Sequence, residues 1–154
     1  MHNSKPKIGN CFYRHATIED LPDIMLINDQ FEHRWAIEKF KEVFENKIPI
    51  ILGYNEDDVL IGYLVYFLVL DEGRIINVAV DKFFQNQSYG KRLIHRSLEE
   101  MYESDIHYAL LDVKTDNLSA IHLYTKMGFQ ILCRRDGYYT GEIEGDSYYM
   151  QLRL

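Results

Sequence analysis

The stretch from Val78 to Leu93, VAVDKFFQNQSYGKRL, constrains the fold more than any other part of this chain. It begins as an apolar strand, continues as a polar loop with a single glycine, and enters a helix at about Tyr89. The start of a helix presents backbone N–H groups without intrahelical partners and the positive end of the helix macrodipole. A loop leading from a strand into a helix is therefore typical of an anion site, and we expect phosphate there. The phosphate-binding motifs GxxxxGK[ST] and GxGxxG do not occur in the sequence, which argues against a binding site for a nucleoside triphosphate or a dinucleotide.

Composition bounds the class of protein and of partner. A chain of 154 residues with 47% hydrophobic and 27% charged residues is typical of one globular domain, which we expect to span residues 1–154. The net charge is −7, from 17 basic and 24 acidic residues. Binding to nucleic acid requires a basic face, so we expect no nucleic-acid partner, whereas a cationic partner is compatible with this charge.

The cysteines and the apolar segments favour a cytoplasmic protein. Cys11 and Cys133 lie far apart, without a CxxC motif or a histidine at metal-ligand spacing, and we interpret both as reduced thiols. The six histidines form no HxH or HxxxH pair, so we assign no metal site. The N-terminal stretch MHNSKPKIGN is not apolar enough for a signal peptide. The apolar run 59–70 is too short to cross a bilayer, so we expect no membrane partner.

Hydrophobic periodicity predicts strands and helices in an irregular alternation. We expect a strand at 10–15, a helix that starts with a capping box at Thr17 and Asp20 and runs to about Gln30, and a helix at 36–45. Strands follow at 50–54, 59–70 and 74–80, the last after a turn at 71–73. A helix at 89–104, a strand at 109–113, a helix capped by Asn117 and ended by Gly128, and strands at 129–135 and 147–154 complete the domain.

The polar loop after the strand at 74–80 resembles a known cofactor loop. Its residues Gln85, Asn86, Gln87, Ser88, Tyr89 and Gly90 fill the pattern Gln/Arg-x-x-Gly-x-Gly/Ala of the acyl-CoA pyrophosphate loop in the GNAT acetyltransferase superfamily. Ser88 replaces the first glycine, which matters because glycine lets a backbone approach a phosphate closely or take a positive φ. By itself the loop also fits an ordinary strand-to-helix connection. The predicted element order, β-α-α-β-β-β-α-β-α-β-β, is that of the GNAT fold, a mixed and mostly antiparallel sheet with helices on both faces.

The second half of the chain resembles one GNAT branch, the ribosomal-protein-alanine N-acetyltransferases and related N-terminal acetyltransferases. The stretches that carry this resemblance are NVAVD at 77–81, LDV at 111–113, Asn117, and AIHLYTKMGF at 120–129. They cover about half of the chain closely, whereas the part before Leu70 resembles only the general fold.

The resemblance implies a site for acetyl-CoA. The backbone of Val78, Ala79 and Val80 would pair with the pantetheine arm, because an exposed strand edge satisfies two amides as it would a β-strand. The loop from Asn86 to Lys91 would hold the pyrophosphate, with Lys91 and Arg92 adding positive charge; the alternative is that these two are a solvated basic pair on a helix. Asn117 would contact pantetheine, or serve only as a helix cap.

The resemblance also implies two catalytic residues. Tyr124 stands four residues before Gly128, where the family has a tyrosine that protonates or stabilises the departing CoA thiolate; its pKa of about 10 lies above the 8.5 of a thiol. The alternative for Tyr124 is a core side chain. Asp112 occupies the place of the family's glutamate general base and is shorter by one methylene, roughly 1.5 Å. It would act directly or, because it is short, through a water, or else only satisfy backbone groups at a strand end.

The acceptor site is expected around three aromatic residues. Tyr138 and Tyr139 fall close to the sequence position at which the resembling enzymes have a Tyr-Tyr pair that holds the substrate peptide. Trp35 stands where those enzymes have an aromatic residue after the first helix. Surface packing is the alternative, since the chain has 12 tyrosines.

We therefore expect a cytoplasmic enzyme that moves acetyl from acetyl-CoA to the N-terminal α-amine of a protein, for which a ribosomal protein is one candidate, by direct attack. Two alternatives stay open. One is an acetyltransferase for a small amine such as a polyamine or an amino sugar. The other is an acyl-CoA-binding module that has lost catalysis, which the departures at Ser88 and Asp112 allow.

Overall fold

The computed structural model describes residues 9–137 and 145–154. Its elements in chain order are β1 (Phe12–His15), the 3-10 helix η1 (Ile18–Asp20), α1 (Leu21–Asn28), α2 (Ile37–Glu45), β2 (Ile50–Tyr54), β3 (Leu60–Val69), β4 (Glu72–Val80), the 3-10 helix η2 (Lys82–Phe84), α3 (Tyr89–Glu103), β5 (Tyr108–Lys114), α4 (Leu118–Lys126), β6 (Gln130–Arg135) and β7 (Ser147–Arg153). This order of strands and α-helices confirms the predicted one.

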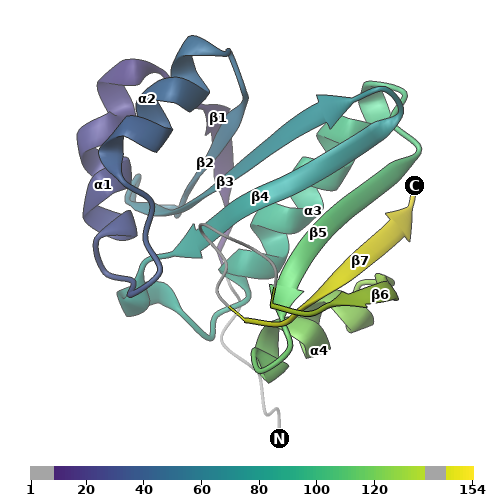
Figure 1. Cartoon of the computed structure of the whole chain (residues 1–154). Coiled ribbons are helices and arrows are strands. Elements are labelled where there is room, and N and C mark those ends of the chain that lie inside the picture. The colour runs from purple at the N-terminus through teal and green to yellow at the C-terminus, as the bar shows by residue number, and fades with distance from the viewer. Residues whose placement is uncertain (1–8, 138–144) are drawn as a thin grey trace, which may run out of the picture.

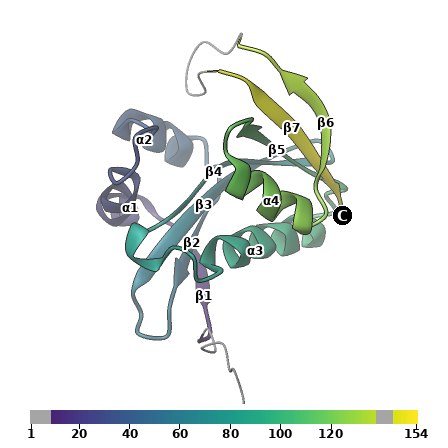
Figure 2. The same ribbon diagram turned by 90° about the horizontal axis from the view of Figure 1, so that it is seen from below.

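The strands form one sheet between two layers of helices. The strand order is β1-β2-β3-β4-β5-β7-β6, and neighbours run antiparallel except β4 and β5, which are parallel. Helices α1 and α2 cover one face, and α3 and α4 cover the other, as Figure 1 and Figure 2 show together. Strand β2 contributes side chains to the cores on both faces of the sheet. Ile51 packs in the core under α3, whereas Ile50 and Leu52 pack under α1 and α2. Alternate side chains of a strand point to opposite faces, so a strand covered on both sides needs apolar residues throughout.

The sheet opens between β4 and β5. The two strands pair at Glu72↔Tyr108, Gly73↔Ala109 and Arg74↔Leu110, and they then diverge, as Figure 1 shows. A bulge in β4 contributes to the divergence, because Tyr66 of β3 faces Ile75 whereas Val65 faces Asn77, which leaves Ile76 as an extra residue. A bulge bends its strand and increases the local twist. The C-terminal part of β4 therefore has an edge toward β5 with which no strand of residues 9–137 and 145–154 pairs.

The turn before β4 corrects one expectation. The turn was expected at 71–73, but Val69 already pairs with Glu72, so only Leu70 and Asp71 lie in it. Leu70 takes a φ of 57°, a conformation that the sequence gives no reason to expect of a leucine. Gly73 lies within the strand, where a Cβ would come 2.5 Å from the Met101 sulfur. Close packing of α3, not turn geometry, explains this glycine.

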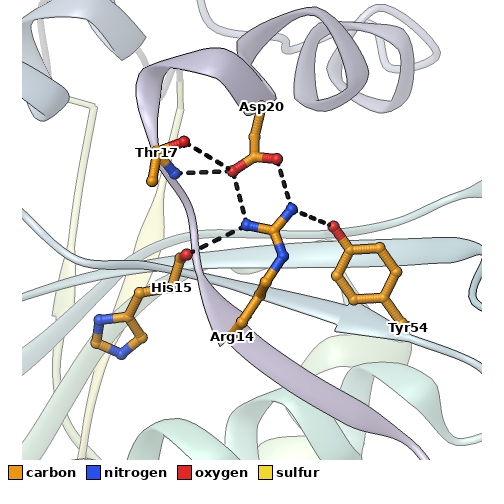
Figure 3. A network of polar contacts seen from close by, with 5 residues as sticks. All are labelled: Arg14, His15, Thr17, Asp20 and Tyr54. Carbon is orange, nitrogen blue, oxygen red and sulfur yellow. Dashed lines mark hydrogen bonds and ion pairs between the residues drawn. The ribbon is translucent and has the colours of Figure 1, made fainter.

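A polar network fixes the start of the first helical segment (Figure 3). The Asp20 carboxylate accepts from the Thr17 backbone N–H at 2.8 Å, and from both terminal nitrogens of Arg14 at 2.8 and 2.6 Å. Arg14 also donates to the Tyr54 hydroxyl at 2.8 Å. The predicted capping box is present, and the Arg14 guanidinium lowers the pKa of Asp20. The network joins β1, η1 and the end of β2, and so positions the chain that continues through α1.

Candidate active site

The loop between β4 and α3 is held in a defined conformation. The Asp81 side chain accepts from the Phe83 backbone N–H at 2.9 Å, and the Gln85 amide donates to the Val80 carbonyl at 3.1 Å. Phe84 packs edge-on against Tyr89, with ring centres 6.1 Å apart. These contacts anchor both ends of the loop, so its backbone is shaped before a ligand arrives.

Ser88 adopts the conformation that a glycine would favour. Its φ is 66°, and Asn86 has a φ of 63°. A left-handed conformation costs a non-glycine residue on the order of 1 kcal/mol. Ser88 therefore has a positive φ, one of the two reasons for which a glycine would suit this position, although a serine fills it. Gly90 is less restrictive, because a Cβ there would make only an ordinary contact of 3.7 Å with Val80.

The first turn of α3 has backbone N–H groups that make no hydrogen bond within the helix. Ser88 is the N-cap, and its side chain makes no capping hydrogen bond. The Arg92 N–H bonds to the Ser88 carbonyl, so the N–H groups of Tyr89, Gly90 and Lys91 precede the intrahelical ladder. With the helix dipole behind them, these amides suit an anion such as a pyrophosphate.

A groove of about 590 Å³ lies against this helix end. The predicted cofactor residues that line it are Val78, Ala79, Val80, Gln85, Asn86, Ser88, Tyr89, Gly90, Lys91 and Asn117, together with Tyr124. Gln87 is exposed and is not among the lining residues. Phe31, Phe84, Ile94, Ser119, Ala120 and Leu123 complete the wall, and the sequence analysis did not single them out as site residues. The only sequence signal of the five apolar residues was their apolar character, which core residues share, and Ser119 had no such signal.

The groove reaches both faces of the sheet at the opening between β4 and β5. Phe31 follows α1 on one face, whereas Leu123 and Tyr124 belong to α4 on the other, and all three line the same cavity. The edge of β4 runs between them. A linear ligand with amides could therefore bond to this edge as an added strand and pass through the sheet. Asn117 lines the groove while its side chain caps α4 by accepting from the Ala120 N–H at 3.3 Å.

Tyr124 lies in the wall of the groove with its ring almost fully buried. The side chain is 8% exposed and packs edge-on against Phe129 at 5.8 Å. Burial raises the pKa of Tyr124 to about 12, so the hydroxyl keeps its proton throughout the neutral range. Complete proton transfer to a thiolate of pKa about 8.5 would cost about 5 kcal/mol, at 1.36 kcal/mol per pKa unit. The geometry therefore suits a hydrogen bond to a developing thiolate better than full protonation.

Asp112 lies on the opposite face of β5 from the core under α3. Ala109, Leu111 and Val113 pack in that core, so the alternating Asp112 points to the other side. Its carboxylate accepts from the Ser147 hydroxyl at 3.5 Å and lies 3.8 Å from an Arg135 nitrogen. Burial raises the pKa of Asp112, and Arg135 opposes that shift. The structure does not bring Asp112 into the lining of the groove, but places it on the face to which the groove opens past Phe31.

Of the three residues expected to bind the acceptor, the structure describes only Trp35. Trp35 is buried, packs against Phe40 at 5.1 Å, and exchanges backbone hydrogen bonds with the Asn28 side chain. It does not line the groove, and its indole belongs to the core under α1 and α2, so a substrate contact of Trp35 stays a prediction. Tyr138 and Tyr139 lie outside the described residues.

Within 9–137 and 145–154, no three His, Cys, Asp or Glu side chains are grouped so that they could hold a metal ion. No helix in this part of the chain has the length and apolar character needed to cross a bilayer.

Comparisons with known proteins agree with this geometry. The model of the Acetyltransferase (GNAT) family matches residues 17–129. The chain is similar to the ribosomal protein bS18-alanine N-acetyltransferases of Salmonella typhimurium, with 32% identity over 104 residues (67% of this chain, 70% of that protein), and of Escherichia coli K12, with 31% over 101 residues (65% and 68%). The crystal structure of the ribosomal-protein-S18-alanine N-acetyltransferase from Escherichia coli shares the fold, with a TM-score of 0.84, 24% identity and 94% coverage of both chains. The chain therefore belongs to the GNAT family of acetyltransferases, and it is an acetyl-CoA-dependent acetyltransferase.

Proposed function

We propose that this enzyme transfers the acetyl group of acetyl-CoA to the N-terminal α-amine of a protein, and that a ribosomal protein is among its acceptors. The observation that carries the proposal is the opening of the sheet between β4 and β5. It gives a groove with Tyr124 in its wall access to the face on which Asp112 lies. The names of the similar proteins supply the acceptor class.

The described residues fit the pyrophosphate and the pantetheine arm of the cosubstrate. The N–H groups at the start of α3 and the charge of Lys91 suit the pyrophosphate. The edge of β4 from Val78 to Val80 suits the two amides of pantetheine, and Tyr124 lies in the wall of the same groove, where it would face the thioester. Bound acetyl-CoA supplies an activated acyl carbon, which an amine can attack without a protein nucleophile.

The transfer needs one proton removed and one negative charge stabilised. The nitrogen of the acceptor amine forms a bond to the thioester carbon, and its surplus proton passes to Asp112, through a water because the aspartate side chain is short. The carbon–sulfur bond then breaks, and Tyr124 donates a hydrogen bond to the sulfur that leaves. Neither Cys11 nor Cys133 lines the groove, in agreement with direct transfer.

A short carboxylate favours an α-amine over a lysine side chain. An α-amine has a pKa of about 7.7–8.0 and is partly neutral at pH 7, whereas a lysine amine near 10.4 costs about 3–4 kcal/mol more to deprotonate. The pKa of Asp112 is raised by burial, which makes this carboxylate a better proton acceptor than an exposed one. Deprotonating an N-terminal amine at this site therefore costs less free energy than deprotonating a lysine side chain.

The acceptor face argues against a polyamine. Arg74, Arg135 and Lys114 surround Asp112 by strand position, so a polycation would meet like charges there. The presence of both Tyr124 and a carboxylate at position 112 argues against a module without catalysis.

The test is an acceptor screen with purified enzyme and acetyl-CoA. The acceptors are an alanine-starting peptide, the same peptide with a blocked N-terminus and an internal lysine, and spermidine. The proposal expects turnover of the free peptide with kcat/KM at least tenfold above the other two. Preference for spermidine or for the blocked peptide would refute it.

A further inference from the structure

Asn77 is a polar residue in an apolar part of β4. The other residues from Ile75 to Val80 are all apolar. The partner of Asn77 in β3 is Val65, which packs in the core under α1 and α2. Residues paired across two strands point to the same face of a sheet, so the Asn77 side chain lies on this face, where it is half-buried. Asp112 lies on the same face of the sheet.

The bulge in β4 brings Asn77 level with Asp112 across the opening of the sheet. Strands β4 and β5 pair at Arg74↔Leu110, so in a regular strand the second residue after Arg74 would be level with Asp112. That residue is Ile76, but Ile76 is the extra residue of the bulge, and Asn77 takes the next place in the ladder with β3. Bulges beside active sites re-aim side chains in this way. Because the two strands have diverged at this level, Asn77 and Asp112 lie on opposite sides of the opening.

A chain of polar contacts orients the Asn77 amide. The Tyr63 hydroxyl donates its hydrogen to the Asn28 Oδ1 atom at 3.4 Å, and the Asn77 side chain also hydrogen-bonds to this hydroxyl. Since a hydroxyl has only one hydrogen to donate, Asn77 contacts Tyr63 with the donor end of its amide, Nδ2. The pKa of Tyr63 agrees with this assignment, because burial raises it whereas the contact with Asn77 lowers it, as a hydrogen-bond donor does. The acceptor end, Oδ1, therefore points away from Tyr63.

The Asn77 Oδ1 atom is available to a ligand at the opening of the sheet. Within residues 9–137 and 145–154, no group donates a hydrogen bond to it. Strand β3, which carries Tyr63, flanks β4 on one side, and the opening flanks it on the other, so an oxygen turned away from Tyr63 faces the opening. The next residue, Val78, begins the edge of β4 that lines the groove. A thioester that passes along this edge therefore comes close to the Asn77 oxygen.

Two hydrogen-bond acceptors orient a primary amine for attack. A neutral primary amine has two N–H groups and one lone pair, and holding both N–H groups fixes the direction of the lone pair. Asp112 takes one of the two, through a water. We propose that the Asn77 Oδ1 atom accepts a hydrogen bond from the other N–H, so that the enzyme prefers primary amines to N-methylated N-termini.

Asn77 is then a catalytic residue that takes up no proton. An amide oxygen accepts a hydrogen bond without ionising, so Asn77 holds the amine while the surplus proton still passes to Asp112. This inference rests on the proposed N-terminal acetylation, and it adds a substrate class to it.

The test compares a primary with a secondary amine. One acceptor peptide starts with alanine and the other with N-methylalanine, whose single N–H is needed at Asp112, and kcat/KM is measured for both. Asn77→Ala should lower kcat for the alanine peptide by about three- to tenfold, the contribution of one neutral hydrogen bond, with the Kd for acetyl-CoA unchanged. The N-methyl peptide should lose little, so the preference for the primary amine should fall by the same factor.

Asn55→Ala is the matched control. The Asn55 amide oxygen accepts from the backbone N–H groups of Asp57 and Val59, both at 3.0 Å, in the turn between β2 and β3 and outside the groove lining. Its loss should lower the Tm and leave the preference for the primary amine unchanged.

The pH dependence separates Asn77 from Asp112. Because the amide does not titrate, Asn77→Ala should lower kcat/KM by the same factor at every pH, whereas the loss of Asp112 should change the shape of the profile. If Asn77→Ala does not fold, Asn77→Ser takes its place: the side chain is shorter by one bond, roughly 1.5 Å, and should lose the same preference.

An unchanged preference for the primary amine in the variant that folds would overturn the inference and leave N-terminal acetylation intact, with Asn77 only a partner for Tyr63. Equal kcat/KM for the two peptides in the parent enzyme would also overturn it. No acetylation of any free N-terminus would instead refute the proposed function.

Discussion

Replacing Tyr124 by phenylalanine removes one hydroxyl from the wall of the groove and leaves the packing of the ring unchanged. The ring is 8% exposed and contacts Phe129, contacts that phenylalanine retains. The lost interaction is a hydrogen bond to a developing thiolate, and hydrogen bonds to charged groups contribute about 1.5–3 kcal/mol, equivalent to about 10- to 150-fold in rate. We expect kcat to fall about 100-fold, while the Kd for acetyl-CoA changes less than about threefold.

Steady-state kinetics and calorimetric binding measure the two effects. Because burial raises the pKa of Tyr124 to about 12, ionisation of this residue should not reduce kcat of the parent enzyme below about pH 10. Tyr66→Phe is the matched control: Tyr66 donates to Glu100 at 2.7 Å, far from the groove lining, so its loss should lower the Tm and spare kcat. An unchanged kcat in Tyr124→Phe would show that the tyrosine is only a core residue.

Three further changes test other parts of the account. Ser88→Gly should bind acetyl-CoA equally or more tightly by calorimetry, because glycine accepts a φ of 66° without strain; a large loss would make the hydroxyl a phosphate ligand. Asp112→Asn should reduce kcat/KM most at low pH, where the amine is protonated, and Asp112→Glu should retain or raise it; parent-like values at every pH would leave Asp112 structural. Asp20→Asn should lower stability by about 1–2 kcal/mol at pH 7 in a thermal melt. Because Arg14 lowers the pKa of Asp20, its contribution is present above the unfolded value near 3.9 and is lost as the pH falls through the folded value, so the two melts should converge there. A difference that persists under acid would contradict the ion pair.

Local signals predicted the elements around the groove. Asn117 caps α4, and Gly128 takes a φ of 103° just after that helix, both as the sequence indicates. The loop pattern marked Ser88 as a position where the family has glycine, either for a positive φ or for a close approach to phosphate, and the structure shows the positive φ. These features depend on a few neighbouring residues, and short-range chemistry decides them.

Features that depend on distant contacts were not predictable in this way. The role of Gly73 depends on Met101 of α3, and the burial of Trp35 depends on Phe40 and on the Asn28 side chain. Arg74 and Arg135 are far apart in sequence, and both lie near the Tyr149 ring only because β4, β5, β7 and β6 follow one another in the sheet. No spacing along the chain encodes that neighbourhood, which therefore had no sequence signal.

The claim that the acceptor is an α-amine is tested most directly by internal competition. One alanine-starting peptide with a free N-terminus and an internal lysine is incubated with the enzyme and limiting acetyl-CoA, and fragmentation mass spectrometry locates the acetyl group. The account predicts at least a tenfold excess of acetyl on the N-terminal nitrogen, because a lysine amine costs about 3–4 kcal/mol more to deprotonate at neutral pH. Acetyl found mainly on the lysine nitrogen would contradict it.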